Sequence, residues 1–304
     1  MTELDAFRSE IRTWLESSVP TSLKGRPLPL SYEGVGDQEP ANIQADRARY
    51  VERMVSRGFT APTWPKQYGG GGLTPAEARV LQEELNRLKL APALMGMGLQ
   101  MIGPTLLVHG SEEQKQRFIP AIVRGETRWC QGFSEPGAGS DLASLRTAAK
   151  LDASRERYVI NGSKIWTSGA HFADWIFMLV RTDETSKHNG ITFILVDMKT
   201  PGIEVKPIRL ISGHSMFCEV FFNDVVAEAQ NVVGAVNQGW TVAKTLLNFE
   251  RSGMGTGGGN AARRGSTNGN AIIALAKESV GEVDGKLANA TLRDKLASLL
   301  IDEM

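Results

Sequence analysis

The sequence predicts an α+β protein in three consecutive parts. These are an N-terminal helical domain over residues 1–125, a central β domain over 126–230, and the start of a C-terminal helical domain over 231–304. Apolar residues recur at helical spacing up to about residue 125 and again from Gln238, whereas short β-branched and aromatic runs lie between them. Because no helical pattern separates those runs, we expect an antiparallel sandwich or barrel.

Three N-terminal helices carry a sequence signature at their first turn. In a capping box, a Ser or Thr side chain and an acid or amide three residues later satisfy each other's free backbone N–H groups. The predicted pairs are Thr2 with Asp5, Thr74 with Glu77, and Ser111 with Gln114. The helix that begins after Ser111 is expected to end at Gly125, since glycine favours helix C-termini.

The stretch between Lys89 and His109, LAPALMGMGLQMIGPTLLV, has no charge and is long enough to resemble a membrane span. It also contains two prolines, three glycines and a glutamine, and no second segment of that kind exists. We therefore expect a buried helix and no membrane span.

The central part contains five strand-like runs: RYVING, DWIFMLVRT, GITFILVDM, IEVKPIRL and CEVFFNDV. Asn161-Gly162 is a typical hairpin dipeptide and predicts a turn. The final helix is expected to begin at a cap formed by Thr291 and Asp294. Its apolar stripe is still running at Met304, so the last domain looks unfinished.

Composition excludes several classes of function. Lys plus Arg and Asp plus Glu both total 34, and this balance without long charge runs argues against a nucleic-acid-binding surface. The two cysteines and four scattered histidines lack metal-ligand spacing, so we predict no metal. The amphipathic N-terminus is unlike a signal peptide, and a cytoplasmic location fits best.

The segment WCQGFSEPGAGSDLASLRT, residues 129–147, is the most unusual in the chain. Its SEPGAGSD core has neither helical nor strand periodicity and reads as an ordered turn after a strand. Gly137 and Gly139 permit close approach and unusual dihedrals, while Ser134, Ser140 and bare N–H groups can form a nest for anionic oxygens. The turn therefore suggests a phosphate-bearing ligand, with a plain β-turn as the alternative.

Four ordered motifs resemble the acyl-CoA dehydrogenase family: TWPKQYGG, SEPGAGSD, INGSKIWTSGAHFADW and LNFERSG. The resemblance covers the whole chain and implies that family's fold. It also implies FAD as cofactor, an acyl-CoA thioester as substrate and an acceptor of the electron-transfer flavoprotein type. Members are usually tetramers, so we expect a homo- or hetero-oligomer, a dimer or tetramer.

The resemblance also implies individual flavin contacts. Ser168 would donate a hydrogen bond to flavin N5, Trp166 would lie against the ring, and Ser140 would contact both the FAD pyrophosphate and the CoA side. Gln131 departs from a commoner aromatic residue, although an amide can still donate to flavin carbonyl oxygens. Without the resemblance, Trp166 would read as a core aromatic and Ser168 as a turn residue. The implied cofactor contacts are Gln131, Ser134, Gly139, Ser140, Trp166, Thr167 and Ser168.

Glu250 is implied as the catalytic base. Removing a proton alpha to a thioester requires a carboxylate in a dry pocket, where its basicity rises. Arg251 and Asn248 are implied as substrate contacts together with Ser140. The alternative for Glu250 is a surface acid beside Arg251.

We therefore expect an FAD-dependent acyl-CoA dehydrogenase that forms a trans-2-enoyl-CoA, with Glu250 taking the alpha proton and flavin N5 the beta hydride. Two alternatives stay open. A related oxidase would release peroxide if oxygen reached the reduced flavin. A non-catalytic or partly catalytic structural subunit of a hetero-oligomer would explain the short C-terminal part and the glycine-rich segment after Arg251. A branched or ring-bearing acyl group is suggested by Gly253, Gly255 and Gly257 to Gly259.

Overall fold

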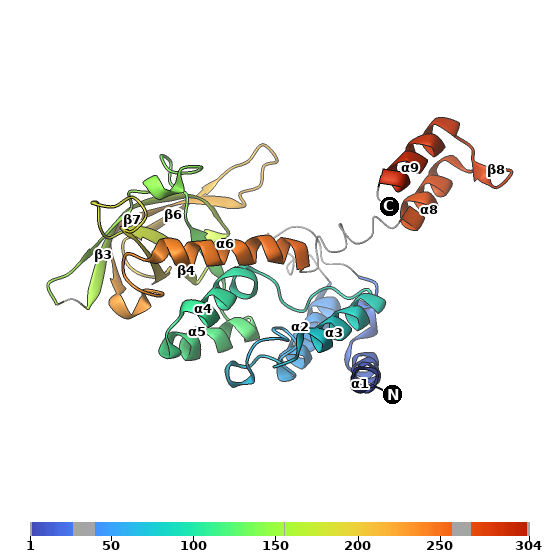
Figure 1. Cartoon of the computed structure of the whole chain (residues 1–304), viewed down its shortest axis with the longest axis horizontal. Coiled ribbons are helices and arrows are strands. Elements are labelled where there is room, and N and C mark those ends of the chain that lie inside the picture. Colours follow the sequence, from blue (N-terminus) through green and yellow to red (C-terminus); the bar gives the residue numbers. More distant parts are fainter. Residues whose placement is uncertain (1, 27–39, 155, 257–268, 303–304) are drawn as a thin grey trace. The chain divides into compact units, whose positions relative to one another are not determined.

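The computed structural model describes residues 2–26, 40–154, 156–256 and 269–302 (Figure 1). The chain divides into two compact units, Met1–Glu250 and Arg251–Met304. The first unit holds the N-terminal helices, a β-sheet and most of helix α6. The second holds two further helices with a short hairpin between them.

The N-terminal part is helical, as the sequence predicts. Its α-helices are α1 (Glu3–Ser18), α2 (Ala41–Ser56), α3 (Pro75–Arg87), α4 (Gly103–His109) and α5 (Glu112–Arg124). All three predicted capping boxes are present, at the first turns of α1, α3 and α5. Gly125 ends α5 in the left-handed region at φ 71°, where a side chain would be strained.

The apolar stretch before His109 is only partly the buried helix that we expected. Residues before Gly98 are irregular, and Gly98–Ile102 forms a π-helical turn that continues into α4. Gly96 at φ 125° lies in the irregular part, which explains why the helix does not start earlier. Among the described helices, none has the length and apolarity needed to cross a membrane.

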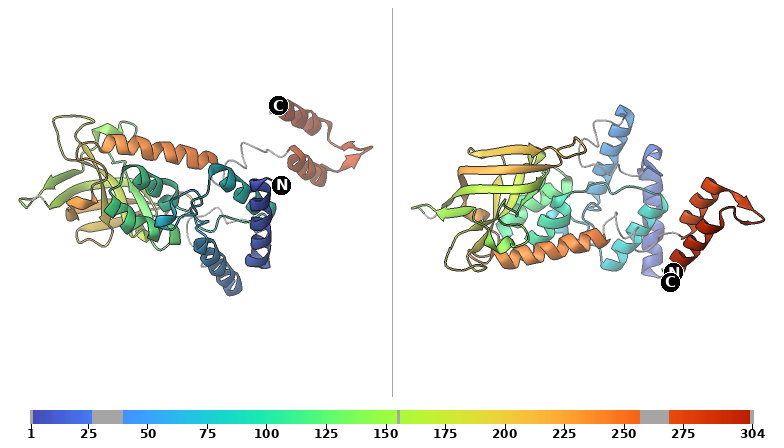
Figure 2. Two further views of the ribbon diagram at one scale, coloured as in Figure 1. Left: turned by 60° about the horizontal axis from the view of Figure 1, so that its bottom comes forward. Right: turned by 90° about the horizontal axis from the view of Figure 1, so that it is seen from above.

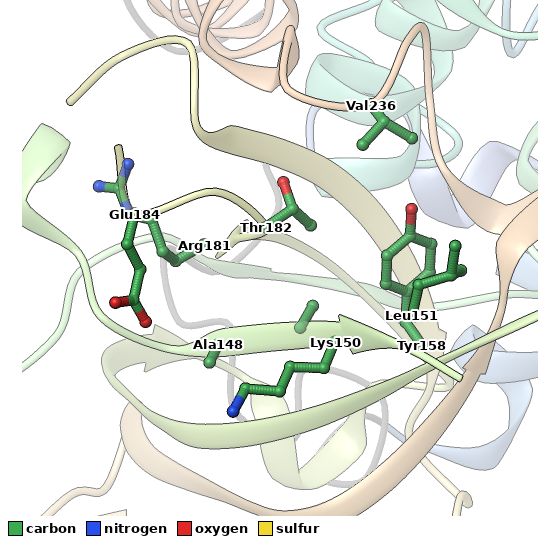
Figure 3. A pocket seen from close by; sticks show the side chains of 9 residues that line it. Ala148, Lys150, Leu151, Tyr158, Arg181, Thr182, Glu184 and Val236 are labelled. Atoms are coloured by element: carbon green, nitrogen blue, oxygen red, sulfur yellow. The ribbon is translucent and has the colours of Figure 1, made fainter. Parts of the chain in front are cut away.

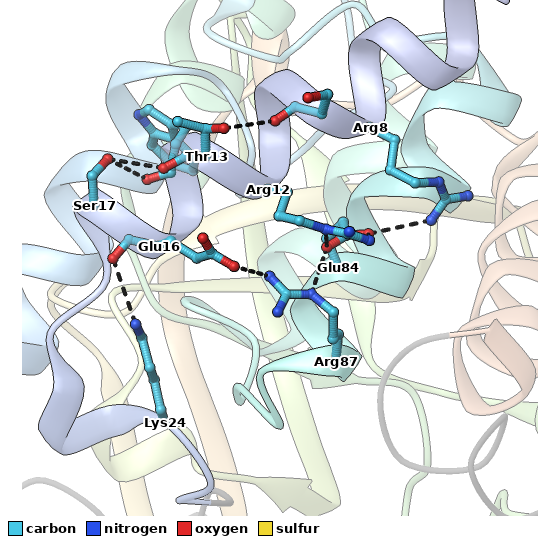
Figure 4. A network of polar contacts seen from close by, with 10 residues as sticks. Arg8, Arg12, Thr13, Glu16, Ser17, Lys24, Glu84 and Arg87 are labelled. Atoms are coloured by element: carbon cyan, nitrogen blue, oxygen red, sulfur yellow. Dashed lines mark hydrogen bonds and ion pairs between the residues drawn. The ribbon is translucent and has the colours of Figure 1, made fainter. Parts of the chain in front are cut away.

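A buried carboxylate ties α1 to α3 (Figure 4). Glu84 on α3, whose side chain is 2% exposed, accepts hydrogen bonds from Arg12 at 2.8 and 3.0 Å and from Arg87 at 2.7 Å. Arg8 adds a longer contact of 3.4 Å. These guanidinium groups, Arg12 foremost, hold the pKa of Glu84 at about 2.

The central part forms one seven-stranded sheet. Its strands are β1 (Trp129–Gly132), β2 (Ala148–Leu151), β3 (Arg157–Ser168), β4 (Trp175–Arg181), β5 (Ile191–Asp197), β6 (Ile203–Ile208) and β7 (Phe217–Glu228). The strand order is β1-β4-β2-β3-β7-β6, with β5 on β4. Four strand pairs are antiparallel, while β1 and β2 run parallel to β4. The five strands predicted from the sequence are β3 to β7.

The hairpin predicted at Asn161-Gly162 is wrong. Both residues lie inside β3, where the pairing with β7 shifts register between Ile160 and Gly162. Gly162 has φ 147°, and a Cβ there would come within 2.7 Å of Thr147. The glycine therefore serves a β-bulge and a close approach of two strands rather than a turn.

Strand β4 separates two cores. Phe177 and Leu179 face the helices α4 and α5 and the buried side of α6, whereas Ile176 and Met178 face β3 and β7. This alternation follows the two-residue period of a strand whose two faces are both covered. In Figures 1 and 2, α6 runs beside α4 and α5 along the sheet, and Leu246 belongs to their shared core.

Helix α6 (Gly239–Thr256) starts where the sequence analysis expected helical pattern to return. The second unit contains α8 (Gly269–Val280), the hairpin strands β8 (Glu282–Val283) and β9 (Lys286–Leu287), and α9 (Ala290–Asp302). The cap predicted at Thr291 is wrong, because α9 begins earlier and the Asn289 side chain accepts the Leu292 N–H at 2.9 Å. Gly257 to Gly259 lie outside the described residues.

Candidate functional site

The turn after β1 is joined directly to the end of β3. The Ile165 N–H donates to the Ser134 carbonyl oxygen at 2.9 Å. Within the turn, Glu135 and Ala138 exchange two backbone hydrogen bonds, at 2.9 and 3.0 Å. The two groups of predicted flavin contacts, residues 131–140 and 166–168, are therefore neighbours in the fold although they lie far apart in the sequence.

The tip of the turn is open. Gly137, Gly139 and Ser140 are exposed, and a Cβ added at either glycine would meet nothing within 4 Å. Neither glycine has a positive φ, so the prediction of unusual backbone dihedrals at these two positions is wrong. What remains is the close approach that a bare backbone allows, with N–H groups and a hydroxyl available to an anionic oxygen.

Trp166 is held out of the core by a strained backbone. It has φ 60°, uncommon for a bulky residue, at a register shift between Lys164 and Thr167 in the pairing of β3 with β7. Its side chain is 56% exposed, and its ring meets the edge of Phe217 at a centroid distance of 6.1 Å. The core-aromatic alternative is therefore wrong, and a large flat apolar surface is presented beside the turn.

The two residues after Trp166 face different surroundings. Thr167 is fully buried, opposite Cys218 on β7, and its hydroxyl has no hydrogen-bond partner among the described residues. A contact from Thr167 to a ligand would therefore use the main chain. Ser168 and Gln131 are half-buried at the ends of β3 and β1, so their polar groups can reach a ligand.

Two functional candidates escaped the sequence analysis. Lys164 is fully buried, and its Nζ lies 2.8 Å from Glu135 Oε1 and 3.1 Å from the Phe133 carbonyl oxygen. Burial, the largest cause, lowers the pKa of Lys164 to about 8, while Glu135 opposes that decrease. Burial, the largest single cause, acts to raise the pKa of Glu135, but Lys164, the Thr147 side chain and the Arg146 backbone N–H together outweigh it and lower that pKa.

Glu250 lies on α6, four residues beyond Leu246, the last residue of that helix that is fully buried in the core. Val242, Ala243 and Leu246 are buried, Glu250 is half-buried and Asn248 is exposed. Glu250 forms no ion pair or hydrogen bond with another described residue, so the structure does not bring it into contact with the turn. Arg251 is exposed and belongs to the second unit.

A cavity of about 390 Å³ lies elsewhere, between the edges of β2, β3 and β4 (Figure 3). None of the residues predicted from the sequence as contacts lines it. Its lining residues are Ala148, Ala149, Lys150, Leu151, Tyr158, Arg181, Thr182, Glu184 and Val236. The part of the chain that the structure describes contains no cluster of His, Cys, Asp or Glu suited to a metal ion.

The donor set around the turn fits a flavin dinucleotide. An isoalloxazine ring needs hydrogen-bond donors for its carbonyl oxygens and N5 and an apolar surface against its face, and the pyrophosphate needs N–H and hydroxyl donors. Gln131, Ser134 and Ser168 carry groups that could donate to the ring, and Trp166 offers an exposed apolar surface. The open turn ending at Ser140 could supply the donors for the pyrophosphate.

Comparison with known proteins gives the family. Residues 30–126 match the profile of the acyl-CoA dehydrogenase N-terminal domain, and residues 130–225 match that of the acyl-CoA dehydrogenase middle domain. The chain belongs to the acyl-CoA dehydrogenase family, and the predicted fold class is confirmed.

Curated relatives include the acyl-CoA dehydrogenases IpdE1 and FadE34 of Mycobacterium tuberculosis. IpdE1 is 40% identical over 252 residues, which cover 83% of this chain and 64% of IpdE1. FadE34 is 50% identical over 206 residues, 67% of this chain and 28% of FadE34. This chain therefore spans less than two thirds of each of these relatives.

Two solved structures extend the likeness to the whole chain. The Tcur3481-Tcur3483 steroid acyl-CoA dehydrogenase matches with a TM-score of 0.71 at 34% identity. The match covers 99% of this chain and 72% of the chain in that structure. The ChsE4-ChsE5 complex from Mycobacterium tuberculosis has a TM-score of 0.70 at 25% identity, covering 100% and 73%. Each is named as an assembly of two kinds of chain.

Proposed function

We propose that this chain forms the FAD site and carries the base of an acyl-CoA dehydrogenase. The reaction would remove a proton and a hydride from adjacent carbons of an acyl-CoA thioester and give the trans-2-enoyl-CoA. When bound, FAD supplies the hydride acceptor at its N5 atom. The observation that carries the proposal is the hydrogen bond from Ile165 to Ser134, because it joins the turn to the strand end with Trp166 and Ser168.

The roles of the chain's own residues follow from their chemistry. With FAD bound, the Ser168 hydroxyl would donate to N5 and stabilise negative charge there, and the exposed Trp166 ring would shield the cofactor from water. Glu250 takes the alpha proton. A half-buried carboxylate on a helix is suited to this role, because a carboxylate is a common general base in enzymes.

The base assignment is tested by Glu250→Gln, with Lys244→Gln, an exposed position on the same helix, as the matched control. Both variants should bind FAD. We expect Glu250→Gln to lower turnover about 10²-fold or more, the usual worth of a positioned base, and the control to keep wild-type turnover. A fully active Glu250→Gln would refute the assignment.

We further propose a bulky, branched or ring-bearing acyl group. Support comes from the likeness to a structure named as a steroid acyl-CoA dehydrogenase. Rates with ring-bearing and straight-chain acyl-CoAs distinguish the two cases. Faster turnover of straight chains would refute this part of the proposal.

A hetero-oligomer is the second proposal, because both solved assemblies described above contain two kinds of chain. In such an assembly this chain would contribute either the complete site or a structural half. The electron acceptor would be of the electron-transfer flavoprotein type. Peroxide formation under air, without dependence on an added acceptor, would instead indicate an oxidase.

A further inference from the structure

A buried ion pair lies directly beneath the turn that carries the proposed flavin contacts. The Lys164 side chain is 0% exposed, the Glu135 side chain is 8% exposed, and Nζ and Oε1 are 2.8 Å apart. Fully buried charges are rare in proteins and are usually retained with several hydrogen bonds. Here each partner also makes hydrogen bonds to backbone groups, so the ion pair connects separate backbone segments as well as two side chains.

Lys164 and Glu135 hold the backbone on both sides of Ser134. Lys164 Nζ donates to the carbonyl oxygen of Phe133, the residue before Ser134. Glu135, the residue after it, is fixed to Lys164, and the Ser134 carbonyl itself accepts from Ile165. Three consecutive turn residues are thus attached to two consecutive residues of β3.

The Glu135 carboxylate also fixes the far side of the turn. It accepts the backbone N–H groups of Arg146 at 2.7 Å and Thr147 at 2.9 Å. The segment 136–145, which includes Gly139 and Ser140, therefore lies between Glu135 and the two residues whose N–H groups bond to the Glu135 carboxylate. Its tip has no such support, because Gly137 and Gly139 face open space.

Stability alone does not explain the pair. Replacing a buried ion pair by apolar residues of similar volume is often neutral or stabilising, because desolvation offsets the attraction. What an apolar pair could not do is accept two N–H groups and donate to a carbonyl at the same time. The function of the charges is therefore to fix the conformation of the turn.

We propose that Lys164 and Glu135 are positioning residues for the flavin: they hold the turn in its binding conformation before the cofactor arrives. This inference rests on the proposed FAD site. It goes further in assigning the order of the turn to two residues that touch no ligand.

The first test uses the unmodified 304-residue chain without FAD. The amides of Glu135, Ala138, Arg146 and Thr147 all donate within or to the turn and should be protected from hydrogen exchange. Exchange at the rate of an unstructured peptide in the folded, FAD-free chain would overturn the proposal. This readout needs no flavin, so it stays informative if the chain fails to bind FAD and the proposed function falls.

The second test uses the double variant Lys164→Met/Glu135→Gln, which leaves no unpaired charge and keeps an acceptor for one backbone N–H. We expect the FAD dissociation constant to rise about 10-fold or more, the loss typical when a group that orients ligand-binding residues is removed. Turn amides should exchange faster while thermal unfolding of the FAD-free protein stays near wild type. An unchanged dissociation constant and unchanged exchange would overturn the proposal.

Two further variants complete the experiment. Glu135→Asp keeps the charge but is one methylene too short to reach all three donors, so it should weaken FAD binding even if the double variant does not fold. The control is Arg157→Met/Glu228→Gln, which removes an exposed ion pair at the other end of β3, with side chains 55% and 46% exposed. The control should leave FAD binding unchanged, and an equal loss in both would overturn the proposal.

Discussion

The buried Glu84 carboxylate predicts how the stability of the helical part depends on pH. Its pKa is held at about 2 against an ordinary value of 4.5. Because the folded-state pKa is depressed, the stabilisation is fully present above about pH 5 and is lost as pH falls toward 2. The gap between the two values corresponds to about 3 kcal/mol at neutral pH.

That figure needs a reduction for solvent screening. The side chains of Arg8, Arg12 and Arg87 are 36%, 48% and 38% exposed, so water weakens their attraction for the carboxylate. We therefore expect Glu84→Gln to lower the free energy of unfolding by about 2 kcal/mol at pH 7. The assay is urea unfolding of wild type and variant between pH 3 and 7.

The pH dependence distinguishes this account from a simple loss of packing. The difference between wild type and Glu84→Gln should be largest above pH 5 and should narrow toward pH 3. Glu126→Gln, which breaks an exposed pair with Arg124, is the control and should cause no measurable change. A Glu84→Gln effect that is absent, or equal at pH 7 and pH 3, would refute the reasoning.

Three more predictions concern the site and its support. Ser168→Ala should keep the fold and lower the rate of flavin reduction by acyl-CoA about 10-fold or more, measured by anaerobic stopped flow, since it removes one donor toward N5. Trp166→Ala removes an exposed, strained side chain, so we expect unchanged thermal stability but weaker FAD binding in a fluorescence titration; a large drop in melting temperature would contradict this. Gly103→Ala would place a Cβ 2.1 Å from the Trp64 ring, so it should lower the free energy of unfolding in urea by about 1–3 kcal/mol. Wild-type stability of this variant would show that the segment carrying Trp64 moves aside without cost.

Local signals in the sequence predicted much of the fold. The three capping boxes are contacts between residues three apart, so they can be read without any tertiary information, and all three are present. The five strands β3 to β7 were also evident from β-branched and aromatic runs. Strand β2, AAKL, has no such composition and forms because β3 and β4 offer it pairing partners.

The failures arise where tertiary contacts override local preference. Asn161-Gly162 is a turn dipeptide by composition, but Thr147 approaches so closely that only glycine fits within the strand. Thr291 is a good cap in isolation, yet the helix begins at Ala290 and the Asn289 side chain accepts the Leu292 N–H.

The candidate site likewise has a part that local sequence signals predict and a part that depends on tertiary contacts. Its turn was visible in the sequence as SEPGAGSD, and the exposure of Trp166 agrees with a ligand-facing role. Lys164 could not be found, because a lysine is rarely buried and a charged side chain within a strand is expected to face solvent. Its partner Glu135 lies 29 residues away, a distance that no periodicity connects.

The central claim is that this chain builds an FAD site. The most direct test is the visible absorption spectrum of the purified chain, prepared without added flavin and then titrated with FAD. We predict the paired bands of oxidised protein-bound flavin, either from the start or on addition of FAD, followed by bleaching when a suitable acyl-CoA is added without oxygen. A folded, colourless protein that does not bind added FAD would contradict the account.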